Sequence, residues 1–216
     1  MILAAGLATR LRPLTEGLPK ALVDMSGRTL LEITFERLRK YGVDEVIINV
    51  HHLAHMIIEY LKANDNFGIQ VEVSHEHSLL DTGGGLKKAA WFFLEDPNRL
   101  DEPFILHNVD VLSTIDLGRM LEVHSDSKAL ATLAVQERDT ATCLVFDEQL
   151  QLLRRWSKID GGKEIVRESE QSQALAFTGI HVISPRLLQK ITEKGKFSII
   201  DAYLSLASRG CRIVAF

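Results

Sequence analysis

Short apolar segments alternate with amphipathic segments along the first half of this chain of 216 residues. The apolar segments have the length of buried strands, and the amphipathic segments repeat apolar residues with the period of a helix. Strands that alternate with helices of about ten to fifteen residues form right-handed βαβ units. We therefore predict an α/β fold, with a doubly wound and mostly parallel sheet that carries helices on both faces.

The expected elements follow from this periodicity. In the first half the predicted strands are Met1–Ala5, Glu45–Val50, Ile69–Ser74 and Pro103–Val109, and the predicted helices are Leu30–Tyr41, Leu53–Ala63 and Gly84–Leu94. In the second half the predicted strands are Ala129–Gln136, Thr142–Asp147, Leu150–Trp156, Ala174–Ile183 and Arg212–Phe216, and the predicted helices are Pro185–Glu193 and Ile199–Ser208. The polar stretch 158–173 is predicted to be a loop. We expect one domain over 1–216, in which residues 128–216 extend the sheet and cover its carboxyl edge.

Composition excludes several classes of protein. Hydrophobic residues make up 46% and charged residues 25%, and the net charge is −4, which argues against a nucleic-acid-binding protein. Cys143 and Cys211 are too few and too far apart to suggest a disulfide framework or a thiolate zinc site. Because there is no apolar run of about eighteen residues and no signal peptide, we expect a cytoplasmic protein that does not bind membranes.

The first predicted strand leads into a basic loop that contains two prolines. The residues of interest there are Gly6, Thr9, Arg10, Arg12, Pro13, Pro19 and Lys20. A glycine lets the backbone approach an anion, and arginine and lysine donate charge-assisted hydrogen bonds to phosphate oxygens. The loop therefore predicts a polyphosphate site, although neither G-x-x-x-x-G-K-[ST] nor G-x-G-x-x-G occurs.

An aspartate stands at the end of another predicted strand. Asp110 follows the apolar run that ends at Val109, which places its carboxylate at the same edge of the sheet as the basic loop. Such a carboxylate suits Mg²⁺, which binds one or two protein carboxylates and completes its shell with phosphate oxygens and water. A simple turn or helix-capping role for Asp110 is the alternative.

Glycine-containing segments leave alternatives open. The run Asp81–Gly85 precedes a predicted helix, so it is either an anion or base-edge site or a flexible turn. Gly179 within its predicted strand indicates either the approach of a ligand or a bulge.

The histidines do not predict a metal site. His51 and His55 lack the glutamate of an H-E-x-x-H zinc motif, and His75 and His77 fit an exposed edge, so we expect no histidine metal site. Lys158 and Asp201 are weaker candidates, for which an exposed surface position is favoured.

Four segments also resemble those of a known family, and one of them is Thr178-Gly179 within AFTGIHVISP, which resembles the family's segment that approaches the sugar. The run from Gly6 to Lys20, written G-x-[GA]-T-R-x-x-P-x-T-x-x-x-P-K, resembles the signature loop of the sugar-nucleotide pyrophosphorylases, with Ala8 where a second glycine is usual. If the backbone there needs a positive φ, alanine is strained. Residues 108–110 are similar to the family's Asn-Gly-Asp turn, with Val109 in place of the glycine. Residues 82–85, T-G-G-G, are most similar to the branch that acts on muramate, mannose or heptose 1-phosphates.

The resemblance implies a Rossmann-like nucleotidyltransferase fold and an activity. NTP and a sugar 1-phosphate would give an NDP-sugar and pyrophosphate, with Mg²⁺ as cofactor. It implies a nucleotide-binding half, 1–127, and a sugar-binding half, 128–216. The residue roles that it implies are catalysis for Arg10 and Lys20, nucleotide binding for Gly6, Ala8, Thr9, Arg10, Lys20, Thr82 and Gly83, sugar binding for Asn108, Thr178 and Gly179, and metal binding for Asp110.

Departures from the family pattern favour an alternative function. The family continues past a strand like Arg212–Phe216 into a Trp-x-Asp-x-Gly-like turn whose aspartate is the second metal ligand, and this sequence ends at Phe216. Either the sequence is part of a longer protein or that ligand is absent. Together with Ala8 and Val109, this favours a non-catalytic nucleotide or sugar-nucleotide sensor as the alternative. A dinucleotide-dependent oxidoreductase is disfavoured for two reasons. No G-x-G-x-x-G occurs, and the second strand ends in Val50 instead of the acidic residue that such enzymes use to bind the ribose. The sequence indicates neither the base, the sugar nor an oligomeric state.

Overall fold

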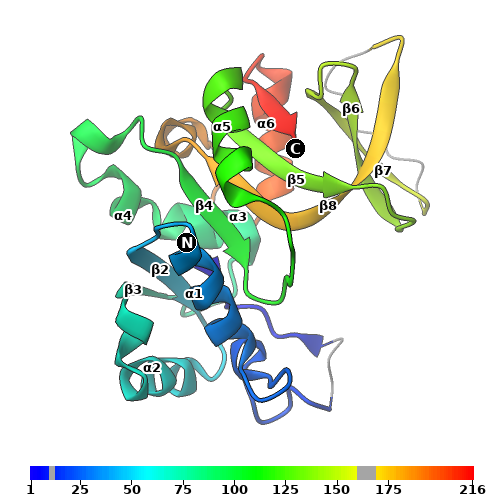
Figure 1. Cartoon of the computed structure of the whole chain (residues 1–216). Coiled ribbons are helices and arrows are strands. Elements are labelled where there is room, and N and C mark those ends of the chain that lie inside the picture. The colour runs from blue at the N-terminus through cyan, green and yellow to red at the C-terminus, as the bar shows by residue number, and fades with distance from the viewer. Residues whose placement is uncertain (10–12, 160–168) are drawn as a thin grey trace.

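The computed structural model describes residues 1–9, 13–159 and 169–216 (Figure 1). Its strands are β1 (Ile2–Leu3), β2 (Glu45–Val50), β3 (Gln70–His75), β4 (Phe104–Asn108), β5 (Ala131–Gln136), β6 (Thr142–Asp147), β7 (Leu152–Ser157), β8 (Ser172–Ile183) and β9 (Ile213–Ala215). Its α-helices are α1 (Leu30–Lys40), α2 (Ala54–Ala63), α3 (Asp81–Lys88), α4 (Ala90–Leu94), α5 (Leu117–Ser127) and α6 (Ile199–Ser208). Short 3₁₀ helices include Lys20–Leu22 and Pro185–Lys190. Arg10 and Arg12 of the basic loop lie outside the described residues, as does most of the predicted loop 158–173.

The main sheet has the strand order β3-β2-β1-β4-β8-β5-β9. Strand β1 lies between β2 and β4 and is parallel to both, so that Ile2 is level with Ile48 and with His107. Strand β8 is antiparallel to β4 and to β5, and β5 is parallel to β9. Within the described part of this path, every strand except β8 therefore runs in the same direction. The prediction of a mostly parallel sheet is confirmed.

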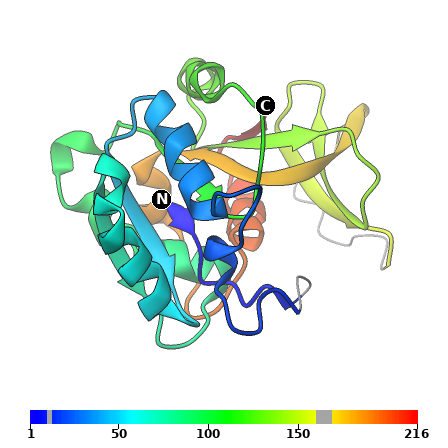
Figure 2. The same ribbon diagram turned by 60° about the horizontal axis from the view of Figure 1, so that its bottom comes forward.

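Each face of the sheet carries its own apolar core. Successive strand residues point to opposite faces, so Ile47 packs in one core with Tyr203 of α6, and Ile48 packs in the other with Phe35 of α1. Helices α3, α4 and α6 cover the first face, and α1, α2 and α5 cover the second. Figures 1 and 2 show α5 and α6 on opposite sides of β5. The prediction of helices on both faces is confirmed.

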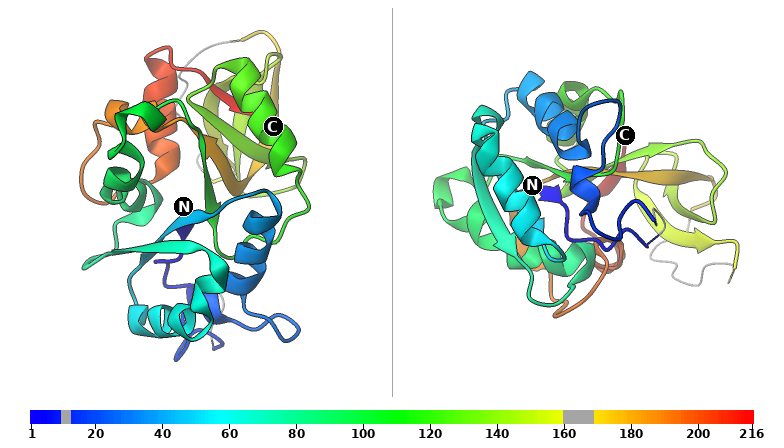
Figure 3. Two further views of the ribbon diagram at one scale, coloured as in Figure 1. Left: turned by 60° about the vertical axis from the view of Figure 1, so that its left-hand side comes forward. Right: turned by 90° about the horizontal axis from the view of Figure 1, so that it is seen from below.

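The long strand β8 joins the two halves of the chain. Its second part pairs with β4 of the first half and β5 of the second, and its first part pairs with β6. Strands β6, β7 and the start of β8 form an antiparallel ribbon that extends to one side of the molecule (Figure 3). Arg155 of β7 forms an ion pair with Asp201 of α6 at 2.7 Å, which holds the ribbon against that helix. Among the described residues, no helix is both long and apolar enough to cross a membrane.

The helices differ from the sequence prediction in three places. The single helix predicted over Gly84–Leu94 is instead α3 and α4, with a break at Ala89 where ψ is 1°. The predicted helix Pro185–Glu193 is a 3₁₀ helix that ends at Lys190. Helix α5 was not predicted, although Asp116 caps it by accepting a hydrogen bond from the Arg119 N–H at 3.0 Å. Its apolar face is narrow, which hides the helical period.

The run Asp81–Gly85, for which a ligand site and a flexible turn were the alternatives, is the first part of helix α3, because its glycines allow close packing. A Cβ on Gly84 would lie 2.4 Å from the Gly195 carbonyl oxygen. A Cβ on Gly83 would lie 2.3 Å from the Phe197 ring. The helix therefore lies directly against residues 195–197, and tertiary packing overrides the low helix propensity of three successive glycines.

We expect Gly84→Ala to lower the free energy of unfolding by about 1–3 kcal/mol, because the new methyl group overlaps backbone that cannot move away freely. Gly118→Ala is the matched control in helix α5, where a Cβ would lie 3.3 Å from Asp116 Oδ1. That control should change stability by no more than about 1 kcal/mol in either direction, because alanine favours the helix but Asp116 must shift slightly to admit the methyl group. Urea denaturation of both variants tests this, and equal effects would contradict it.

Three histidines are buried in the core. His181 is 1% exposed and its Nδ1 lies 2.8 Å from the Tyr203 hydroxyl, and His124 Nδ1 lies 2.9 Å from Thr132 Oγ1. Burial lowers the pKa of His181 to about 3 and the pKa values of His107 and His124 to about 4, from an ordinary value of 6.5. All three are therefore neutral in the folded protein at pH 7.

We expect the free energy of unfolding to fall as the pH falls from 6.5 toward 4. In that window the unfolded chain binds protons at histidines that remain neutral in the folded state, so acid favours unfolding. Denaturation at pH 7.5, 6 and 5 measures the slope. His181→Phe should reduce the slope because it removes one such group. A stability that does not vary over this range contradicts the prediction.

Candidate active site

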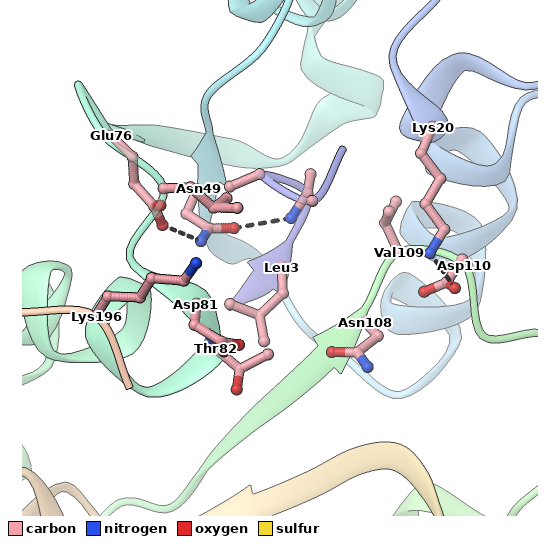
Figure 4. Close-up of a pocket in the computed structure, with 14 residues that line it drawn as sticks. Leu3, Lys20, Asn49, Glu76, Asp81, Thr82, Asn108, Val109, Asp110 and Lys196 are labelled. Carbon is pink, nitrogen blue, oxygen red and sulfur yellow. Dashed lines mark hydrogen bonds and ion pairs between the residues drawn. The ribbon is translucent and has the colours of Figure 1, made fainter. Parts of the chain in front are cut away.

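A pocket of about 310 Å³ lies at the carboxyl edge of the sheet, where β1, β2 and β4 end side by side (Figure 4). The crevice beyond the carboxyl ends of parallel strands is the usual binding place in open α/β sheets. The residues that line it are Leu3, Ala4, Ala5, Gly6, Lys20, Asn49, Glu76, Leu79, Asp81, Thr82, Asn108, Val109, Asp110 and Lys196. The first and last of these residues, Leu3 and Lys196, are therefore almost two hundred residues apart in the sequence.

Lys20 and Asp110 form an ion pair at one end of the pocket. Lys20 begins the 3₁₀ helix that follows Pro19, and its side chain is 18% exposed. Asp110 stands in the turn after β4, where the Val111 N–H donates to the Asn108 carbonyl oxygen at 3.1 Å. The basic loop and the predicted metal-binding turn are thus brought together, with a cation and an anion side by side.

A buried hydrogen-bond network at the other end of the pocket was missed by sequence reasoning. Asn49 at the end of β2 accepts from the Ala4 N–H at 2.8 Å and donates to Glu76 Oε1 at 2.7 Å. The second oxygen of Glu76 accepts from the Leu80 N–H at 2.9 Å, and its side chain is 1% exposed. An asparagine inside the apolar run EVIINV was the available signal, because a buried amide needs partners.

Thr82 and Gly83 lie at different depths. Thr82 lines the pocket, and its hydroxyl oxygen accepts a hydrogen bond from the Ile199 N–H at 3.0 Å. Gly83 lies behind it, and its N–H donates to the Phe197 carbonyl oxygen at 3.0 Å. Thr82 is therefore at the pocket, whereas the Gly83 N–H is used in the packing of helix α3 against Phe197.

Of the predicted sugar-side residues, Gly179 lies against Asn108 where β8 passes the end of β4, whereas Thr178 and Gly179 are not among the residues that line the pocket. Gly179 has φ of +91°, and a Cβ there would lie 2.6 Å from Asn108 Nδ2. Asn108 itself lines the pocket, and Thr178 donates from its hydroxyl to the Ala134 carbonyl oxygen at 2.9 Å. Glycine is required at 179 both by the positive φ and by the closeness of the asparagine.

The basic loop leaves the pocket after Gly6. A Cβ on Gly6 would meet no atom within 4 Å, so open space lies beside this glycine. Ala8 has φ of +47°, which is the strained conformation that its place in the motif predicts, and its carbonyl oxygen accepts from the Thr15 hydroxyl at 3.0 Å. Thr9 is exposed beyond it. Arg10 lies outside the described residues.

Lys196 lines the pocket and was also missed. It belongs to the segment that precedes α6, and nothing in its sequence context distinguishes it from other surface lysines. The weaker candidates have other partners: Lys158 pairs with Asp139, and Asp201 with Arg155.

No three His, Cys, Asp or Glu side chains converge as a metal site in the part of the chain that the structure describes. Asp110 is the carboxylate that pairs with Lys20 at one end of the pocket. His51 Nδ1 lies 2.8 Å from the Glu76 carbonyl oxygen, and the rings of His75 and His77 pack edge to face with centroids 5.3 Å apart.

A doubly wound sheet whose carboxyl edge holds a glycine-containing basic loop and an aspartate defines a nucleotide-binding α/β protein. Comparison with known protein families identifies the particular family to which the chain belongs. The family model described as "Nucleotidyl transferase" matches residues 1–144, and the chain belongs to this family.

Three curated relatives illustrate the similarity. The UTP–glucose-1-phosphate uridylyltransferase of Synechocystis is 34% identical over 92% of this chain and 52% of its own length. The N-acetylmuramate alpha-1-phosphate uridylyltransferase of Caulobacter vibrioides is 28% identical over 97% and 84%. Mannose-1-phosphate guanylyltransferase 1 of Arabidopsis thaliana is 30% identical over 88% and 51%. The chain thus spans about half the length of two of these three proteins.

Solved structures confirm the fold. HddC from Yersinia pseudotuberculosis, solved in complex with GMP-PN, has a TM-score of 0.74 at 24% identity and matches 100% of this chain and 88% of its own. A putative glucose-1-phosphate thymidylyltransferase from Bacillus anthracis has a TM-score of 0.79 at 16% identity, over 100% and 84%. The prediction of a Rossmann-like nucleotidyltransferase fold is confirmed.

We expect Ala8→Gly to raise the free energy of unfolding by about 0.5–1 kcal/mol, because glycine adopts a positive φ without the steric cost that alanine has. Ala63→Gly in the exposed last turn of α2 is the opposite control and should lower stability by a similar amount. Thermal denaturation of the two variants measures both effects. A loss of stability in Ala8→Gly would show that the alanine side chain contributes more than the strain costs.

Proposed function

We propose that this protein transfers a nucleotidyl group from an NTP to a sugar 1-phosphate and releases pyrophosphate. The observation that carries the proposal is the Lys20–Asp110 pair at the carboxyl edge of a nucleotidyl transferase fold, with Asn108 lining the same pocket. A cation beside an anion suits a reaction in which two phosphates must be held together while charge develops between them.

The chemistry needs no covalent enzyme intermediate. An oxygen of the sugar phosphate attacks the α-phosphorus of the NTP, and the bond from that phosphorus to the β-phosphate oxygen breaks in line. Pyrophosphate leaves with the electron pair of the broken bond. The phosphate nucleophile is already anionic, so no general base is required, and the protein contributes positioning and charge neutralisation.

Lys20 is the residue to which we assign the central role. Its ammonium lies within the pocket and is mostly shielded from solvent, at 18% exposure, which strengthens its attraction for phosphate. From there it would bridge the α-phosphate and the incoming sugar phosphate. Arg10 would hold the β- and γ-phosphates; this assignment comes from the motif, since Arg10 lies outside the described residues.

Mg²⁺ is the cofactor that we propose, and the donor set is compatible with it. Asp110 offers a carboxylate that is 36% exposed beside the phosphate-binding lysine. Mg²⁺ binds through one or two protein carboxylates and takes its remaining ligands from substrate phosphates and water. Asp110 would hold the ion, which when bound supplies polarisation of the α-phosphoryl group.

The remaining assignments follow the two sides of the pocket. Gly6, with open space beside it, and Thr82 would contact the nucleotide, and Asn108 would contact the sugar. Ala8, Thr9 and Gly83 on the nucleotide side, and Thr178 and Gly179 on the sugar side, keep the roles predicted from the motifs. Cytoplasmic location likewise stays a prediction.

The test measures pyrophosphate release with UTP, GTP, CTP or ATP against glucose, mannose and N-acetylmuramate 1-phosphates. We expect release with at least one pair, and a loss of about 10²-fold or more in kcat/KM for Lys20→Met and for Asp110→Asn. Asp126→Asn on the exposed face of α5 removes a carboxylate away from the pocket and should leave kcat/KM unchanged.

One result would contradict the proposed reaction, and another would contradict only the Mg²⁺ assignment. Nucleotide binding without pyrophosphate release for any pair would instead support the sensor alternative. Release that persists in EDTA would contradict the Mg²⁺ assignment while leaving the transfer reaction in place.

A further inference from the structure

The pocket has two chemically different ends (Figure 4). Lys20, Asp110 and Asn108 stand at one end, and the Asn49–Glu76 pair stands at the other, where Lys196 points into the pocket. If the first end holds the α-phosphate, as the proposed function requires, the nucleobase lies toward the second. The inference below rests on the proposed function in this respect.

The backbone on both sides of Lys196 is held in place. The Phe197 N–H donates to the Leu80 carbonyl oxygen at 3.1 Å, and the Phe197 carbonyl oxygen accepts from Gly83 at 3.0 Å. Gly195 packs against Gly84, where no side chain fits between the two. The lysine is therefore anchored to helix α3 at its base, and its ammonium extends over the same end of the pocket that Glu76 lines.

Glu76 is held with a fixed orientation. Each of its carboxylate oxygens accepts one hydrogen bond, from Asn49 and from the Leu80 N–H. A carboxylate has about four acceptor positions, so acceptor capacity remains for a ligand. Lys196 is only a donor and Glu76, when ionised, only an acceptor. This end of the pocket therefore presents a donor beside an acceptor.

A donor beside an acceptor distinguishes two classes of nucleobase. Uracil, thymine and guanine carry a keto oxygen next to a ring N–H, which matches a lysine and a carboxylate. Cytosine and adenine carry an amino group next to an unprotonated ring nitrogen, which is the reverse arrangement. We propose that Lys196, together with Glu76, is a specificity-determining residue that selects nucleoside triphosphates with a keto base over those with an amino base.

The experiment measures dissociation constants of UTP, GTP, CTP and ATP by calorimetry, without sugar phosphate. We expect the wild-type protein to bind UTP or GTP about 10- to 100-fold more tightly than CTP and ATP. Lys196→Met should weaken binding of the preferred nucleotide by a similar factor and leave CTP and ATP almost unchanged. Lys194→Met is the matched control, because it removes the same charge from an exposed position of the same segment outside the pocket lining.

Other outcomes overturn the inference. An equal loss for all four nucleotides in Lys196→Met would mean that the lysine acts only as a general positive charge on phosphates. A wild-type protein without preference, or a preference that survives the substitution, would exclude the assignment. Thermal denaturation checks that the variant is folded, and Lys196→Gln is used if it is not.

The same measurements separate this inference from the proposed function. A keto preference that depends on Lys196, without pyrophosphate release, contradicts the proposed function alone. If the protein releases pyrophosphate but Lys196→Met leaves the NTP preference unchanged, this inference alone is contradicted. A protein that binds none of the four nucleotides contradicts both.

Discussion

The side chain of Asn49 connects the elements on which the pocket depends. It accepts from the Ala4 N–H and donates to Glu76, whose other oxygen accepts from Leu80, so one chain of hydrogen bonds links the ends of β1 and β2 to the start of α3. A carboxylate that is 1% exposed is costly without such donors. Gly85 leaves room for the pair, since a Cβ there would lie 2.6 Å from both side chains.

This network explains why distant segments share one pocket. Because the start of α3 is fixed, the glycines of that helix bring it against residues 195–197, and Lys196 arrives beside Glu76. On the other side, β8 enters the sheet next to β4 and brings Gly179 against Asn108. The half formed by 128–216 therefore completes a pocket whose Lys20–Asp110 end belongs to the first half.

The fold was predictable where the apolar pattern follows the backbone period. Glu45–Val50 and Ile199–Ser208 have the predicted bounds, because the strand is a short continuous apolar run buried on both faces and the helix buries residues at helical spacing. Helix α3 was mispredicted since its glycines disfavour a helix locally and are retained for contacts made only in the folded chain. Helix α5 was missed because it buries only a narrow stripe that includes Leu117 and Met120.

The site, like the fold, was predictable only where local sequence pattern determines the position of a residue. Lys20 ends the loop motif and Asp110 directly follows a predicted strand, whereas Lys196 reaches the pocket only through tertiary packing.

The fold accommodates the two substitutions that favoured a sensor. Ala8 adopts a positive φ, which glycine adopts freely, and Val109, 1% exposed, packs in the core while its N–H donates to the Leu3 carbonyl oxygen at 3.1 Å. Neither substitution separates the lysine from the aspartate, so both charged groups of the proposed reaction remain in contact.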